Sequence, residues 1–261
     1  MNASVLYAIN DGIATITFNR PQVMNALDAD MLHGFCAAAG RAAADTAARV
    51  VILRGAGPAF IAGGDVAMFH HNRAAMATLV PELAGELHKG ILALRRAPQP
   101  VIAAVHGAVA GAGMSIMLAC DLVIAAGDTQ FSLAYSRIGA SPDGGATWFL
   151  PRLAGYQKAM EIIFLADAMD AAALQQIGIV NRVVAAGQLD AETGQLARRL
   201  AQGPARAYAE AKALVNRATD AGLAAQLDAE ALAFARCAAT GDFAEGVAAF
   251  VAKRKPQFKG L

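Results

Sequence analysis

The stretch that decides the fold is PVIAAVHGAVAGAGMSIMLACD, residues 100–121. Its first part, residues 101–105, is typical of a buried strand, and the glycine-punctuated residues 113–119 are typical of a helix. His106, Ser115 and the glycines interrupt the apolar run, so it is not a membrane span, which needs about 20 mostly apolar residues. A strand that passes through a glycine-rich bend into a helix predicts an α/β unit.

The same alternation extends toward both ends of the chain. Residues 4–9 and 13–18 carry β-branched and aromatic side chains around Asn10-Asp11-Gly12, which predicts a hairpin. Asp28 precedes a helical stretch to about residue 44. We expect further strands at residues 50–54, 122–126, 130–133 and 178–184, and a helix at residues 81–96. The whole pattern predicts the α/β class.

After residue 157 the sequence becomes mainly helical. Helices are expected at residues 159–165, 171–176, 189–201, 204–218, 223–240 and 243–253. Their apolar stripes are narrow, as in Leu227, Ala231, Phe234 and Cys237, so they need other helices or a partner subunit to cover them. We therefore divide the chain into a core at residues 1–198 and a helical oligomerisation region at residues 199–261.

Composition limits the classes of function. Of 261 residues, 56% are hydrophobic and 16% charged, which is typical of a folded chain. Twenty-two basic and 21 acidic side chains leave a net charge of +1, so no overall field favours nucleic acid or a membrane surface. Three dispersed cysteines and the lack of metal-ligand spacing argue against disulfides and metals. With no visible signal peptide, these features predict a cytoplasmic protein.

Two glycine-rich bends each leave a strand and enter a helix. They are Phe60-Ile61-Ala62-Gly63-Gly64-Asp65 and the stretch from His106 to Gly113. Free amide groups at the start of a helix favour negative charge, and small residues let a ligand approach the backbone. Neither bend has the spacing of a dinucleotide or P-loop motif. A role in packing alone stays open for each bend.

Taken together, four motifs resemble the enoyl-CoA hydratase/isomerase (crotonase) superfamily over essentially the whole chain. They are Asn19-Arg20-Pro21 with Met24-Asn25-Ala26-Leu27-Asp28, the two bends, and Phe149-Leu150-Pro151-Arg152 with Gly155. The resemblance implies a crotonase-like spiral of ββα units and C-terminal helices that pack subunits into a homotrimer or a dimer of trimers. It also implies an acyl-CoA thioester as substrate, with coenzyme A as part of that substrate and no further cofactor.

The resemblance also implies the roles of several residues. Backbone amides of Gly64 and Ala112 are expected to hold the thioester oxygen, each contributing about 3 kcal/mol in the transition state. Asp65 is expected to cap the helix that follows the first donor. The other expected substrate contacts are Ala26, Ala62, Gly63, Asp65, Val66, Gly111, Ser115 and Tyr135.

The acidic residues indicate which member of the superfamily this is. Family hydratases use two glutamates, whereas the matching positions here are Ser115 and Tyr135, neither of which is a carboxylate base. Asp143 lies instead where family isomerases, including the ring-epoxide isomerase of phenylacetate degradation, carry an aspartate. One carboxylate suits a 1,3-proton shift, because it takes a proton from one carbon and returns it two carbons away. We therefore expect an acyl-CoA isomerase with Asp143 as acid/base.

Several alternatives stay open. Pro-Asp-Gly-Gly ahead of an apolar helix also fits an N-cap at Asp143. The family includes hydratases, and dehalogenases in which an aspartate at this place is a nucleophile. A catalytically silent acyl-CoA-binding protein is a further alternative. The acyl group is not fixed, although Met68, Phe69 and Met76 suggest an apolar pocket, which His70 and His71 could border.

Overall fold

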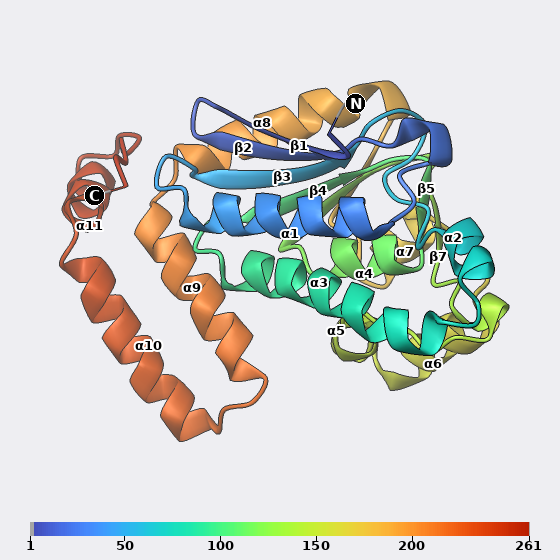
Figure 1. The fold of residues 1–261 in the computed structure, drawn as a ribbon. Coiled ribbons are helices and arrows are strands. Elements are labelled where there is room, and N and C mark those ends of the chain that lie inside the picture. Colours follow the sequence, from blue (N-terminus) through green and yellow to red (C-terminus); the bar gives the residue numbers. More distant parts are fainter. Residues whose placement is uncertain (1–2, 261) are drawn as a thin grey trace.

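The structure is a computed structural model that describes residues 3–260. Its larger sheet has the order β1-β2-β3-β4-β6-β9 (Figure 1). β1 (Val5–Asn10) and β2 (Ile13–Phe18) pair antiparallel, with Val5 opposite Phe18, which confirms the hairpin. The strands that follow are all parallel to β2: β3 (Val50–Gly55), β4 (Val101–Val105), β6 (Leu122–Ala126) and β9 (Arg182–Val184).

Helices cover both faces of this sheet, so its central strands are apolar on both sides. α1 (Ala29–Ala44) and α3 (Met76–Arg96) lie on one face, and α8 (Leu189–Ala201) lies on the other (Figure 1). Along β4 the side chains alternate between two cores: Ala103 and Val105 belong to the larger one, and Ile102 and Ala104 pack toward α8. This double burial explains the continuous apolar run of residues 101–105.

A smaller sheet carries the second glycine-rich bend. It consists of β5 (Ala108–Ala110), β7 (Gln130–Ser132) and β8 (Met169–Asp170), in that order. β5 runs directly into α4 (Ala112–Leu118), all of whose residues are buried. The first bend is attached to β5, because Ile61 forms a parallel bridge with Val109. The two bends are therefore neighbours in space, although Ile61 and Val109 are 48 positions apart in the sequence.

The structure corrects several expected boundaries. α3 begins at Met76 rather than at residue 81, with Pro81 inside the helix, and the helix expected after Asp65 is α2 (Val66–His71). The last strand covers only residues 182–184, and β5 and β8 are strands that periodicity did not predict. Such two- and three-residue strands depend on pairing with distant segments, so local pattern does not reveal them.

The rest of the chain is helical. The remaining helices are α5 (Ala146–Ala154), α6 (Tyr156–Leu165), α7 (Ala171–Gln176), α9 (Ala205–Ala218), α10 (Leu223–Ala238) and α11 (Gly241–Val251). α9 to α11 extend from the core as a C-terminal arm (Figure 1). The expected boundary between residues 198 and 199 lies inside α8, and the arm starts after that helix ends. Among residues 3–260, no helix has the length and apolar character needed to cross a bilayer.

Candidate active site

The first glycine-rich bend holds its backbone in a shape that leaves one amide free. Gly63 has φ +107°, a conformation that side-chain-bearing residues rarely adopt. The Leu27 amide donates to Gly63 O at 2.8 Å, and the Asp65 amide donates to Leu27 O at 2.9 Å. Both neighbours of Gly64 are thus tied to Leu27. Within residues 3–260 the Gly64 amide itself donates to no protein acceptor.

The second bend ends in a helix whose first amide is also free. Gly111 has φ +49° and is the N-cap of α4, and Ala112 is the first residue of that helix. First-turn amides have no acceptor within their own helix, and the Ala112 amide has none elsewhere in residues 3–260. The helix packs tightly on the first bend, since a Cβ on Gly113 would lie 2.5 Å from Ile61 O. Close packing at Gly113 therefore fixes the two bends relative to each other.

Gly64, Ala112 and Asp143 line one small cavity of about 60 Å³. Its other walls are apolar and come from the loop before α1, from α1 itself, and from α2 and α3; they are Leu27, Leu32, Phe69, Val80, Leu83, Ala84 and Leu87. Asp143 is the only titratable side chain in this lining. The sequence indicated Gly64, Ala112 and Asp143 as catalytic candidates and Phe69 as a candidate pocket residue. Val80, Leu83, Ala84 and Leu87 have helical spacing, which could have identified the wall from α3.

Two hydroxyl groups hold Asp143 in place. The Tyr135 hydroxyl donates to Asp143 Oδ1 at 2.5 Å, and the Ser115 hydroxyl donates to the main-chain oxygen of Asp143 at 2.9 Å. Gly144 follows with φ +60°, and a Cβ there would lie 2.8 Å from Ser115 Cβ. The N-cap of α5 is Gly145, with no side-chain cap, so the alternative in which Asp143 caps the helix is wrong.

Tyr135 is a donor rather than an acid or base at neutral pH. Burial raises the pKa of its hydroxyl above the ordinary value, and the nearby Asp143 carboxylate raises it further. The phenol therefore keeps its proton throughout the working pH range. Proton transfer in this cavity rests on the carboxylate alone.

The remaining predicted contacts surround the first bend. Asp65 caps α2, accepting from the Met68 amide at 3.1 Å, as expected. The Ala62 amide donates a hydrogen bond to Met24 O at 3.0 Å. Val66 is the first residue of α2, and 53% of its surface is exposed. Ala26 O accepts from Arg20, whose guanidinium also lies 3.4 Å from Asp65. The sequence predicted no role for Arg20, whereas in the structure its guanidinium links Ala26 O to the Asp65 carboxylate next to the first bend.

Of the suggested pocket residues, Met68, Met76, His70 and His71 are absent from the cavity lining.

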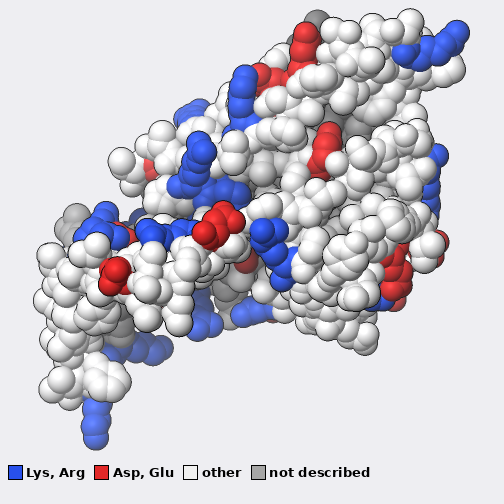
Figure 2. Space-filling view, turned by 90° about the horizontal axis from the view of Figure 1, so that it is seen from below, with Lys and Arg blue, Asp and Glu red and all other residues white. Residues whose placement is uncertain are grey.

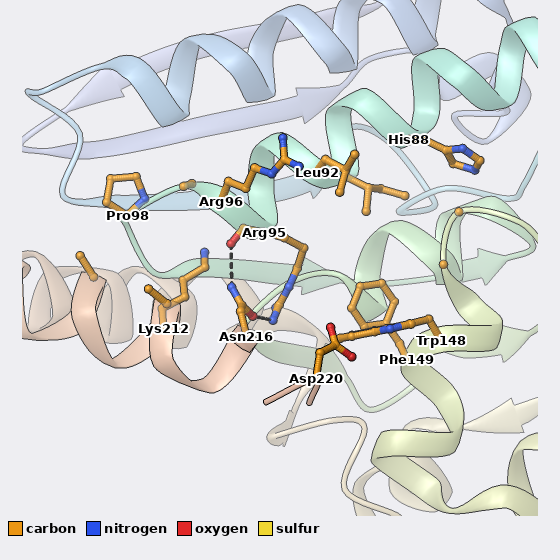
Figure 3. Close-up of a pocket in the computed structure, with 16 residues that line it drawn as sticks. His88, Leu92, Arg95, Arg96, Pro98, Trp148, Phe149, Lys212, Asn216 and Asp220 are labelled. Carbon is orange, nitrogen blue, oxygen red and sulfur yellow. Dashed lines mark hydrogen bonds between the residues drawn. The ribbon is translucent and has the colours of Figure 1, made fainter. Parts of the chain in front are cut away.

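A larger cavity of about 910 Å³ lies between α3, α5 and α9 (Figure 3). Two of its cationic side chains, Lys212 and Arg95, bind protein groups. Lys212 donates to Leu94 O at 2.9 Å and Gln99 O at 3.0 Å, and pairs with Asp121 at 2.7 Å. Asn216 and Arg95 exchange two hydrogen bonds, drawn in Figure 3. These contacts attach α9 to the core, so this cavity lies where the arm packs against the core.

Charge on the surface is mixed. On the face drawn in Figure 2, acidic and basic side chains are interspersed and much of the surface is uncharged. This agrees with the net charge of +1. The two amides without protein acceptors are therefore the local hydrogen-bond donors available to a negatively charged group.

Known proteins resemble this chain over nearly its full length. The profile of the family described as "Enoyl-CoA hydratase/isomerase" matches residues 8–261. A protein of Rhodobacter capsulatus named "Probable enoyl-CoA hydratase" is 38% identical, and 1,2-epoxyphenylacetyl-CoA isomerase of Escherichia coli is 35% identical; each alignment covers 98% of both chains. The crystal structure of an enoyl-CoA hydratase from Polaromonas sp. JS666 superposes with a TM-score of 0.93 at 34% identity, covering 98% of this chain and 99% of that one.

Proposed function

The chain belongs to the enoyl-CoA hydratase/isomerase family and has its crotonase fold, and from this premise we propose that it is an acyl-CoA isomerase. The family acts on acyl-CoA thioesters. The proposed reaction moves a double bond from C3 to C2 of the acyl group, or performs a related ring isomerisation. One observation carries the proposal: a single carboxylate, Asp143, shares a small apolar cavity with the free amides of Gly64 and Ala112.

The two amides account for the first half of the reaction. The thioester oxygen accepts hydrogen bonds from Gly64 and Ala112, and Asp143 takes a proton from C2. The C2–H bond breaks, and its electron pair forms the enolate, whose negative oxygen the amides stabilise. Each preorganised donor of this kind lowers the barrier by about 3 kcal/mol. Without them, a carboxylate is too weak a base to remove a proton next to a thioester.

The same carboxylate completes the reaction. Protonated Asp143 returns the proton to C4, which forms a C4–H bond and leaves the double bond between C2 and C3. The carboxylate is restored and no water is added. Hydration by the two-glutamate route lacks its acids, because Ser115 and Tyr135 stand at those positions and both donate to Asp143.

The test is a panel of 2-enoyl-, 3-enoyl- and phenylacetyl-derived CoA esters in deuterated water. An isomerase interconverts 2- and 3-enoyl esters and places deuterium at C2 or C4. Formation of 3-hydroxyacyl-CoA as the main product would instead establish a hydratase. A covalent ester on Asp143 in the mass spectrum would show nucleophilic catalysis, and a lack of exchange with every ester would show a silent binding protein.

We also propose that the arm assembles subunits into a homotrimer or a dimer of trimers. Large apolar side chains on α10 and α11 are exposed in the single chain: Leu232, Phe234, Phe250 and Val251 are 62–85% exposed. Such a surface is typical of a subunit interface. Light scattering after size-exclusion chromatography would show a mass of three or six chains if the proposal holds and one chain if it fails.

The proposed chemistry needs no metal or organic cofactor beyond the coenzyme A carried by the substrate. Cys36, Cys120 and Cys237 are free thiols, and burial raises the pKa of Cys120. Thiols in this state suit a reducing compartment, so we propose that the enzyme works in the cytoplasm.

A further inference from the structure

The hydroxyls of Ser115 and Tyr135 both donate to one residue. Each hydroxyl has a single proton to donate. A main-chain oxygen only accepts, so the Ser115 proton is used on Asp143 O at 2.9 Å, and an ionised carboxylate only accepts, so the Tyr135 proton is used on Asp143 Oδ1 at 2.5 Å. The two hydroxyl oxygens are 3.3 Å apart and have no proton left for each other. Neither hydroxyl therefore has a proton to offer a substrate.

Helix α4 links this anchor to the oxyanion site. Ala112 begins the helix and supplies a free amide, and Ser115, three residues later, is completely buried. Gly144 packs directly against Ser115, since a Cβ added to Gly144 would lie 2.8 Å from Ser115 Cβ. One rigid helical turn thus sets the position of the acid relative to the carbonyl-binding amide.

We propose that Tyr135 and Ser115 are positioning residues that present one oxygen of Asp143, Oδ2, to the acyl group. Tyr135 occupies Oδ1, and no donor within residues 3–260 reaches Oδ2. Ser115 fixes the backbone, and Tyr135 fixes the rotation of the carboxylate. This inference rests on the proposed acid/base role of Asp143, and it assigns the two residues a task other than substrate contact.

Within residues 3–260, Tyr135 makes the only side-chain hydrogen bond to the Asp143 carboxylate. The facing side chains are Phe69 from α2, Leu83 and Leu87 from α3, and Ser115 from α4, none of which is charged. A hydrogen bond donated to the ionised form of a carboxylate favours that form. Loss of the Tyr135 hydroxyl therefore removes the hydrogen bond that fixes the rotation of the Asp143 carboxylate.

The experiment compares the steady-state kinetics of Tyr135→Phe and the wild type, using the 3-enoyl-CoA ester that the wild type converts fastest. We expect kcat to fall about 10-fold and KM to stay within about twofold, because the carboxylate is misoriented while the substrate contacts remain. Ser115→Ala should also lower kcat at constant KM, because its bond holds the main chain of Asp143. Tyr156→Phe is the matched control, since this tyrosine lies in α6 with 66% of its surface exposed.

A second measurement does not depend on turnover. The carboxyl ¹³C resonance of Asp143, identified by its loss in Asp143→Asn, should differ between Tyr135→Phe and the wild type at the same neutral pH, because the variant lacks the hydrogen bond to Oδ1. An unchanged resonance would overturn the inference, as would a raised KM with unchanged kcat, which would place the hydroxyl on the substrate. If no ester is isomerised, the proposed function fails, but this resonance still decides the role of Tyr135. If Tyr135→Phe does not fold, unchanged kcat in folded Ser115→Ala overturns the inference and a fall with constant KM supports it.

Discussion

Two cavities are lined by consecutive residues, Asp143 in the smaller one and Gly144 and Gly145 in the larger one, and they differ in size and chemistry. The larger one, about 910 Å³, has partly buried cations, and its Lys212 and Arg95 bind Asp121, Asn216 and main-chain oxygens. The smaller one, about 60 Å³, contains two amides with no acceptor and a carboxylate with one free oxygen in the described residues.

The difference teaches that unmet hydrogen-bonding capacity identifies the reactive site better than volume does. Buried polar groups are normally satisfied, so amides held free by the fold are available to a ligand. In the larger cavity Lys212, Arg95 and Asn216 have protein partners, and these bonds attach α9 to the core. Substitutions in the smaller cavity should therefore change catalysis, and substitutions in the larger cavity should change stability.

The largest effect is expected for Asp143→Asn. An amide cannot accept and return the proton, so kcat should fall by about 10³-fold or more, while affinity for the acyl-CoA ester stays within about twofold. Steady-state rates and isothermal titration calorimetry measure the two quantities. Full activity in this variant would remove the carboxylate from the mechanism and leave the small cavity without a catalytic group.

The next effect is expected for Ala112→Pro, which removes one of the free amides. Proline is well tolerated at the first helical position, and Gly111 has ψ −124°, the mirror image of the extended ψ that precedes proline. Loss of one oxyanion donor should lower kcat by about 10² to 10³-fold.

The matched control for Ala112→Pro is Leu223→Pro. Leu223 begins α10, is 75% exposed and follows Gly222 with ψ 153°, so proline fits there as well. This control should retain wild-type kcat. Equal losses in both variants would mean that proline, rather than the missing amide, causes the effect.

A smaller effect, on stability, is expected for Lys212→Met in the larger cavity. The lysine side chain is 10% exposed and pairs with Asp121, which keeps its second partner Arg95. We expect the free energy of unfolding to fall by about 2 kcal/mol in urea titrations. The kcat/KM of the folded variant should equal that of the wild type, and a selective loss of kcat/KM would show that the larger cavity takes part in catalysis.

The smallest effect is expected at the exposed ion pair between Arg254 and Glu245, near the end of the arm and outside both cavities. Hydrogen bonds from Arg254 and from the Gln257 amide lower the pKa of Glu245 to about 2. Because the folded pKa lies below the ordinary value of 4.5, this contact is fully stabilising above pH 4.5 and is lost as the pH falls toward 2. The Gln257 amide resonance should shift in that range in the wild type and not in Glu245→Gln.

Much of the fold was predictable because it is encoded locally. The hairpin at Asn10-Asp11-Gly12, the cap at Asp28 and the apolar strands each follow from a few adjacent residues, and the structure confirms them. The start of α3 was wrong because proline favours the first turn of a helix, whereas Pro81 lies inside this one. β5 was missed because it consists of three residues paired with a distant strand.

Individual residues of the site were predictable from the sequence, but the hydrogen bonds between them were not. Glycines at bends and an isolated aspartate are visible in sequence, but the bond between Tyr135 and Asp143 depends on the turn at Gly144 with φ +60°. The joint around Lys212 was invisible, since it unites residues 118 positions apart through the docking of α9. Tertiary packing decides both, and no local pattern carries that information.

The most direct test of the central claim is the vibrational frequency of the thioester carbonyl in a bound 3-enoyl-CoA. In Asp143→Asn, which holds the ester unconverted, two converging amides should polarise the carbonyl and lower its stretching frequency below that of the free ester in water. The shift should persist when Leu223→Pro is added and shrink when Ala112→Pro is added. A bound carbonyl with the frequency of the free ester would contradict the claim that the Gly64 and Ala112 amides meet on it.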